Sequence, residues 1–355
     1  MLPNTEYTCY VVVKNKKGLE ICESINIKTK ADDYVTRAYV RSTTLRRRLL
    51  QDDQDTQVCT LNSEGGLADC MSAQLDGFLP VATAGAATIG STYDWITFLE
   101  QRTPRNKMYT CPLNPDGTAV SDACKNVFTA GGFVLYNFFN DQSTKAWMLF
   151  ASPGTSKMGA VCDIDAVGDY KDCQDIIPET MITIRGIPLA SPDGQSVYVP
   201  SSEGILCCSA TASNCKNVNI SPSFDVFNEN YAGANIGFQS SNVALIAFDF
   251  VSPVANDTVS VMNDAAMTPL LRCELESPTE FLCEEYGYPF TEDTAIFGFA
   301  FANDGANVYL LTAFNGGFEA AVEYCTVGSE GISGCQRVID LSDQEVVALT
   351  RPIIV

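Results

Sequence analysis

Cysteine is the residue whose spacing points most directly to chemistry in this sequence. Six pairs recur, and their first members lie 52, 51, 46, 65 and 52 residues apart. Paired thiols form disulfides or bind a metal. Zinc sites use close Cys-x-x-Cys or Cys/His clusters, but these pairs are 7 to 13 residues apart and the chain has no histidine. We therefore expect disulfides in the pairs Cys59–Cys70, Cys111–Cys124, Cys162–Cys173, Cys208–Cys215, Cys273–Cys283 and Cys325–Cys335.

The missing histidine also limits catalysis. It excludes a Ser-His-Asp triad, a histidine general base and any His-ligated metal. Acid–base chemistry would fall to carboxylates, tyrosine, lysine or a thiol. The segment from Asp163 to Asp172 begins like a calcium-binding loop, but Val167 and Gln174 stand at two of its ligand positions. We therefore interpret it as a hairpin turn with solvated carboxylates.

Charge divides the chain into two parts. Residues 1–50 carry ten Lys/Arg and five Asp/Glu, whereas residues 51–355 carry 12 and 38. A body this acidic will not bind nucleic acid by counterion release. No stretch reaches about 18 uninterrupted apolar residues, so no transmembrane helix is expected. The regular cysteine pairs indicate an oxidising compartment, extracellular or at the cell surface.

The cysteine pairs belong to a repeat of about 50 residues. Each pair brackets two short polar strands around a turn. A longer apolar hairpin precedes most of them, as at 296–312, where Asn303-Asp-Gly separates two apolar runs; Asp-Gly is a strong hairpin signal. Two hairpins per repeat make a four-stranded unit, which is a β-propeller blade. A disulfide in each outer hairpin would stop the rim of the propeller from fraying, and on an entropic model it contributes about 3 kcal/mol.

The pairs predict an all-β, six-bladed β-propeller with disulfide-clasped outer hairpins. Five of the six outer hairpins follow an apolar hairpin, and the one at 57–72 does not. We expect the apolar run at 344–355 to supply inner strands to that blade and so remove an exposed edge. Seven blades would need another blade within 219–272, where we expect a loop insertion instead.

The segment Ser191–Val199 reads Ser-Pro-Asp-Gly-Gln-Ser-Val-Tyr-Val. It resembles the blades of six- and seven-bladed propellers that carry a Ser-Pro-Asp-Gly-x-x-Val-Tyr-Val pattern. The resemblance is close in this blade and loose in the others. It implies strand and turn chemistry but no activity.

Residues 1–30 form a separate unit. Apolar alternation on both sides of the polar turn 15–18 predicts a hairpin. Leu2, Pro3 and Thr5 followed by Tyr7, with Asn15, Gly18 and Ser24, make the segment similar to the C-terminal end of a fibronectin type III domain. Because two or three strands cannot hold a core alone, this resemblance implies that the chain is a fragment of a longer one. Cys9 and Cys22 would then be a cross-strand disulfide pair.

Residues 31–56 are charged and aperiodic, which predicts a linker before a propeller domain at 57–355. Arg46-Arg47-Arg48 is either part of a solvated linker or a site for a processing protease. Cys207 remains unpaired beside Cys208, because adjacent strand residues point to opposite faces. It is expected to be buried and inert or, alternatively, to bridge to another chain. Asn219-Ile-Ser and Asn256-Asp-Thr are glycosylation acceptors.

Two classes of function fit these features. The first is a secreted, non-catalytic structural or interaction module, of the kind found in adhesion receptors and filaments, without a cofactor. Its faces would bind protein or glycan, and the partners include further copies of the chain. The second is a propeller hydrolase or lactonase with a central calcium, for which Asp94 and Asp141 are candidate ligands. The aromatic residues of the apolar strands are expected to be core between blades: Trp95, Phe133, Phe138, Phe139, Trp147, Phe248 and Phe250.

Overall fold

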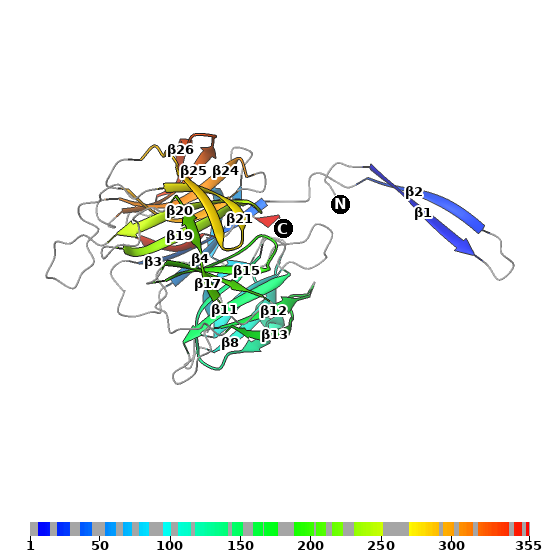
Figure 1. Ribbon diagram of the computed structural model, residues 1–355. Helices are drawn as coiled ribbons and strands as arrows, with labels where there is room; N and C mark the ends of the chain where they lie inside the picture. Colours follow the sequence, from blue (N-terminus) through cyan, green and yellow to red (C-terminus); the bar gives the residue numbers. More distant parts are fainter. Residues whose placement is uncertain are drawn as a thin grey trace.

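A computed structural model shows a chain built almost entirely of β-strands (Figure 1). It describes residues 6–14, 20–28, 36–44, 54–61, 67–72, 78–84, 95–100, 106–114, 118–140, 144–151, 159–165, 167–176, 188–201, 204–210, 215–222, 231–250, 270–290, 294–301, 305–314, 319–340, 344–349 and 353–354. The only helical segment among them is the short 3₁₀ turn Ser121–Ala123. Within this part of the chain no helix is long and apolar enough to cross a membrane.

Five blades, named A to E here, are sheets of strands that are consecutive in the chain. Blade A contains β6 (Phe78–Ala84), β7 (Trp95–Glu100), β8 (Lys107–Pro112) and β9 (Lys125–Thr129). Blade B contains β10 (Phe133–Phe139), β11 (Lys145–Ala151), β12 (Gly159–Ile164) and β13 (Tyr170–Ile176). Blade C contains β14 (Leu189–Ala190), β15 (Ser196–Ser201), β16 (Gly204–Ser209) and β17 (Cys215–Asn217).

Blade D has five strands: β18 (Asn219–Ser221), β19 (Tyr231–Ser240), β20 (Val243–Phe250), β21 (Leu270–Ser277) and β22 (Glu280–Glu285). Its strand β18 adds to β22 in parallel, while the other pairs are antiparallel. Blade E contains β23 (Ala295–Phe301), β24 (Asn307–Phe314), β25 (Glu319–Val327) and β26 (Ile332–Asp340). Blades A and B lie in the lower part of Figure 1 and blade E in the upper part.

The first cysteine pair lies in a sheet of a different kind, which we call the composite sheet. Its order is β27-β3-β4-β5, with β28 also paired to β3. These strands come from distant parts of the chain: β3 (Thr36–Thr44), β4 (Gln54–Leu61), β5 (Leu67–Ser72), β27 (Gln344–Leu349) and β28 (Ile353–Ile354). The predicted pairing of the C-terminal run with the sheet of the first cysteine pair is confirmed.

The prediction of six blades is wrong, because five blades form from consecutive strands and the composite sheet is assembled differently. A cysteine pair marks only an outer hairpin, and it does not show which segments complete the sheet. Strand β3 also corrects the expected linker: residues 36–44 pair with β4, β27 and β28. Alternation in this segment is hidden by its arginines, so sequence reasoning read it as aperiodic.

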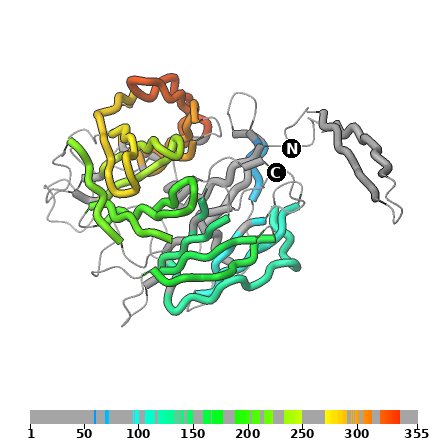
Figure 2. The backbone as a smooth tube through the Cα atoms, turned by 45° about the vertical axis from the view of Figure 1, so that its right-hand side comes forward, coloured from blue at the N-terminus to red at the C-terminus, as the bar shows by residue number. Residues whose placement is uncertain are grey.

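The core consists of apolar layers between neighbouring blades. Strands of the inner hairpins are buried on both faces, and β15 is buried at every one of its six positions. The largest buried side chains include Trp147, Tyr198 and Phe281. Trp95 and Phe248 are buried as expected, whereas Phe139 is only partly buried. The side chains of Phe133, Phe138 and Phe250 lie outside the described part. The tube in Figure 2 follows the successive blades along the chain.

Residues 1–30 contain the expected hairpin, with β1 (Glu6–Lys14) paired to β2 (Glu20–Lys28). The register contradicts the predicted Cys9–Cys22 pair, since Cys9 lies opposite Ile25 and Cys22 opposite Val12. Along an antiparallel hairpin, the numbers of two facing residues always add up to the same value. For Cys9 and Cys22 the sum differs from that value by three, so these two residues do not face each other. The spacing of two cysteines around a turn does not fix register, and the prediction failed for this reason.

Candidate functional site: the clasped outer hairpins

All six predicted disulfides of the repeat are present. Each joins the two strands of its outer hairpin, or one of them to the residue just before the other, with Cα atoms 4.0 to 4.1 Å apart. In blades C and D the two cysteines face one another directly in the strand register. Directly opposed residues on antiparallel strands are within disulfide reach, so the alternation of each hairpin places its own clasp.

The six disulfides differ in exposure. Cys70 and Cys173 are exposed, while their partners Cys59 and Cys162 are buried. Both cysteines are buried in Cys208–Cys215 and in Cys273–Cys283. Some of these disulfides therefore lie at the protein surface, and others lie in the core.

Among the cysteines whose side chains the structure describes, Cys207 is the one without a disulfide, and it is buried. It packs in a cluster with residues of blade D, whereas its neighbour Cys208 packs with residues of blade B. Burial raises the pKa of the Cys207 thiol, and hydrogen bonds with Ser196 and Tyr198 only partly offset this. At 6% exposure the sulfur is shielded from another chain, so the buried position argues against an intermolecular bridge.

The turn at 165–169 in blade B shows why the calcium-like segment is a turn. One carboxylate oxygen of Asp165 accepts hydrogen bonds from the backbone N–H groups of Val167 and Asp169, at 3.0 and 2.9 Å. The other pairs with the Lys171 ammonium at 2.8 Å. Burial raises the pKa of Asp165, but these interactions outweigh it and hold the pKa below its usual value. The Asp165 carboxylate is therefore ionised, and both of its oxygens bind groups of the same hairpin.

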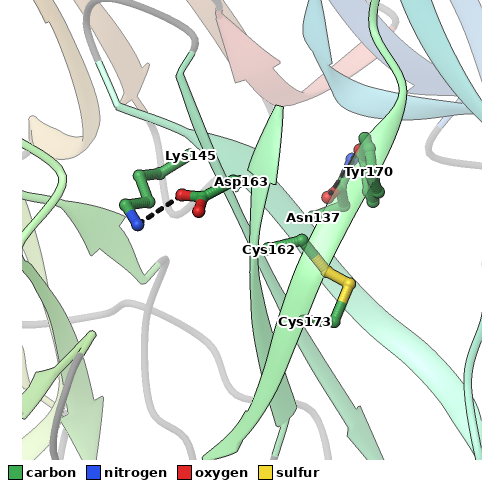
Figure 3. Close-up of a disulfide and its surroundings, with 6 residues drawn as sticks. All are labelled: Asn137, Lys145, Cys162, Asp163, Tyr170 and Cys173. Carbon is green, nitrogen blue, oxygen red and sulfur yellow. Dashed lines mark hydrogen bonds and ion pairs between the residues drawn. A yellow bond between two sulfur atoms is a disulfide. The ribbon is translucent and has the colours of Figure 1, made fainter. Parts of the chain in front are cut away.

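Two further ion pairs involve the same hairpin. The Lys145 ammonium on β11 pairs with Asp163 beside the Cys162–Cys173 disulfide (Figure 3). Lys125 on β9 of blade A pairs with Asp169 at 2.6 Å, across the boundary between the blades. No group of three or more Cys, Asp or Glu positioned to hold a metal ion occurs in the part of the chain that the structure describes.

A partly buried polar contact lies near this disulfide. The Asn137 amide on β10 donates to the Tyr170 hydroxyl at 3.3 Å. Tyr170 also packs near Phe128 of blade A, with ring centroids 6.4 Å apart. Burial raises the pKa of Tyr170, so its hydroxyl stays protonated. The group serves as a structural donor and acceptor between the strands.

The outer hairpin of blade D carries the densest acidic surface described. Glu274, Glu276, Glu280, Glu284 and Glu285 are exposed along β21 and β22. Arg272 pairs with Glu274 at 3.4 Å and with Glu284 at 3.5 Å. Leu282, on the same strand, is 48% exposed. This surface is suited to contact a partner with basic and apolar groups.

Asn219 is exposed on β18, and its amide nitrogen donates to the Glu280 carboxylate at 2.8 Å. The glycosylation acceptor is therefore at the surface. The other acceptor, Asn256, lies outside the described residues, as do Asp94, Asp141 and the triplet Arg46–Arg48.

Sequence reasoning missed the residues that join one blade to the next. Gly168 has φ +79°, and a Cβ added there would lie 2.5 Å from the Thr110 methyl group. The Thr110 hydroxyl donates to the Gly168 carbonyl at 3.1 Å. The glycine itself was a turn signal, but its partner is 58 residues away. No local pattern identifies such a contact.

Comparisons with known proteins support the fold. Neither a known family nor a curated protein sequence matches the chain. Among solved structures, TolB from Acinetobacter baumannii aligns with a TM-score of 0.51 and 10% identity, over 94% of this chain and 76% of that one. The periplasmic gluconolactonase PpgL from Pseudomonas aeruginosa aligns with a TM-score of 0.51 and 11% identity, over 91% and 99%.

These similarities and the sheet topology establish a β-propeller. At such low identity they show the fold alone, and they do not support the fibronectin type III resemblance of residues 1–30. One similar structure is named as an enzyme and the other is not, so both classes of function stay open. The disulfides indicate a location outside the cytosol, extracellular or periplasmic.

Proposed function

We propose that this propeller is a non-catalytic interaction module that acts outside the cell and binds a protein through its surface. The observation that carries the proposal is the set of interactions that the Asp and Glu side chains make. In blade B, Asp163, Asp165 and Asp169 each pair with a lysine. In blade D they form the acidic outer hairpin around the exposed Leu282. Both sets of carboxylates face solvent or a lysine and do not line a buried catalytic cleft.

Charge supports a protein partner with a basic surface. Residues 51–355 carry 12 Lys/Arg against 38 Asp/Glu, and such a field steers cationic partners toward the surface. Further copies of the chain are one source of such a surface, because residues 1–50 carry an excess of five positive charges. The clasped hairpins would give the module a rigid shape in an oxidising environment.

Cross-linking in native material tests the proposal. Lys171 and Lys216 are exposed on the outer strands β13 and β17, so an amine-reactive cross-linker followed by mass spectrometry should join them to another protein molecule. Variants with Glu284→Gln and Glu285→Gln should lose cross-links near blade D. The matched control Asp122→Asn, on the 3₁₀ turn of blade A, should keep them.

Enzyme assays provide the opposing outcome. The disulfide-bonded chain should hydrolyse gluconolactone no faster than the uncatalysed background, with or without added calcium. Calcium-dependent turnover would overturn the proposal in favour of the lactonase-like alternative. Peptide-N-glycosidase treatment of native material, with mass detection at Asn219, tests the secretory route: a glycan there confirms passage through the secretory pathway.

A further inference from the structure

In blades B, D and E, the turn clasped by the disulfide reaches across to the preceding blade. In blade B, the turn 165–169 lies between Cys162 and Cys173. Its Gly168 carbonyl accepts the hydrogen bond from Thr110 on β8, and its Asp169 pairs with Lys125 on β9. Both partners belong to blade A.

Blade D repeats the arrangement toward blade C. The turn between Cys273 and Cys283 contains Thr279, whose carbonyl accepts a hydrogen bond from the Asn219 backbone N–H at 2.8 Å. Asn219 opens β18, which follows β17 of blade C after a single residue and then pairs with β22. That single residue, Val218, donates its N–H to Ile205 of blade C at 2.8 Å. The segment thus ties the outer edge of blade C to the clasped hairpin of blade D.

Blade E repeats it again toward blade D. The turn between Cys325 and Cys335 forms a parallel bridge between Gly331 and Gly287, which follows β22. The Gly287 N–H donates to the Glu330 carbonyl at 3.1 Å, and the Ile332 N–H donates to the Gly287 carbonyl at 2.8 Å. The Tyr286 hydroxyl also donates to the Gly328 carbonyl.

The disulfides themselves lie in the apolar layers that these turns close. Cys162 packs with Leu99 and Met108 of blade A. Cys208 and Cys215 pack with Trp147 of blade B. Cys273 and Cys283 pack in the layer that contains Tyr198 and Ile205 of blade C, and Cys325 packs in the layer that contains Leu245 and Leu270 of blade D. In all four blades the clasp faces the preceding blade.

From this repetition we infer that the disulfides work as directional latches between blades. Each clasp fixes the ends of a turn, and the turn holds the blade against the preceding one. The alternative is a local role in which a clasp only stops its own outer strands from separating. The two roles predict different changes in hydrogen exchange when a disulfide is removed. A local clasp protects only the amides of its own outer strands, whereas a latch also protects amides of the preceding blade.

Hydrogen–deuterium exchange of the whole chain separates the two roles. In the double variant Cys162→Ser/Cys173→Ser, amide exchange should become about tenfold faster in 95–112 of blade A as well as in 159–176 of blade B, since opening of the boundary exposes both. The inner hairpin of blade B, residues 133–151, should change less. Faster exchange confined to 159–176 would overturn the latch.

A second variant keeps the disulfide and breaks the contact. Gly168→Ala places a Cβ in contact with Thr110 and Trp95 at a positive φ, so it should also accelerate exchange in 95–112. The matched control is Gly131→Ala, because nothing lies within 4 Å of a Cβ added at Gly131. Equal exchange in 95–112 for the two alanine variants would refute the inference, even if the double cysteine variant does not fold.

Discussion

The latch between blades A and B is made by side chains, whereas the latch between blades C and D is made by backbone. The first depends on the Thr110 hydroxyl and the Lys125–Asp169 ion pair. The second is the parallel pairing of β18 with β22, in which β18 continues directly from the outer strand β17 of blade C. The two disulfides also differ in exposure. Cys173 of blade B is exposed, whereas Cys283 of blade D is buried.

This difference shows that one repeated covalent device supports boundaries of unequal strength. Exposed charges gain little from pairing and are screened by salt. Buried apolar area and backbone hydrogen bonds do not depend on salt or on a proton. We therefore expect the boundary between A and B to respond to solution conditions before the boundary between C and D does.

Truncation of the core beside the C–D latch should have the largest effect. Phe281 is 1% exposed and packs on Tyr198, with ring centroids 5.5 Å apart. Phe281→Ala should lower the free energy of unfolding by about 3–5 kcal/mol because it leaves a cavity, as measured by urea denaturation. The next residue gives the control: Leu282→Ala should stay within about 0.5 kcal/mol, since Leu282 is 48% exposed. Equal losses would contradict the assigned packing.

Reduction should open the two clasps in a fixed order. Attack on a disulfide needs access of a thiolate to sulfur. Limiting dithiothreitol should therefore reduce Cys162–Cys173 about tenfold faster than Cys273–Cys283, as followed by alkylation and mass spectrometry. Cys207 reports global unfolding in the same experiment, because it is free and buried. Alkylation of Cys207 together with the first clasp would show that no local opening precedes unfolding.

Acid should weaken the clasped turn of blade B through Asp165. Its pKa lies below the usual 3.8 in the folded chain, so its contribution is complete above pH 3.8 and disappears as the pH falls through the lower folded value. The unfolding midpoints of the parent chain and Asp165→Asn should differ at pH 7 and converge at acid values where Asp165 is protonated in the folded chain as well. The control Asp122→Asn, on an exposed turn, should follow the parent at both values. A constant difference would contradict the ionised role of Asp165.

Salt should have the smallest effect. The Lys125 and Asp169 side chains are 43% and 40% exposed, so Lys125→Met should cost under about 1 kcal/mol at low ionic strength. In ~1 M salt, where the screening length falls to about 3 Å, the difference should vanish. Lys216→Met, on the outer strand of blade C, is the comparison variant. A loss from Lys125→Met that persists in high salt would show that the lysine acts by packing.

Sequence patterns predicted the strands and clasps well. The alternation around Cys273 and Cys283 fixes which residues face each other, and the structure places them directly opposite. The same logic failed for Cys9 and Cys22, where the hairpin register is three residues away from the expected pairing. A turn with Asp-Gly constrains the register of its hairpin, but the polar turn 15–18 does not.

The blade count and the linker failed for a different reason. Strand β3 finds its partners in β27 and β28, which are about 300 residues away in the chain. Sequence spacing contains no information on pairing at that distance. The contacts of Gly168 and Gly287 with neighbouring blades were missed for the same reason.

Alternation, turn residues and cysteine spacing act over about a dozen residues, and the disulfide-clasped β-hairpins could therefore be predicted from the amino acids alone. The strands that complete the composite sheet, and the blade that each turn holds, became known only from the folded chain. Those choices depend on apolar layers shared between blades, and each layer is complete only when segments far apart in the chain meet.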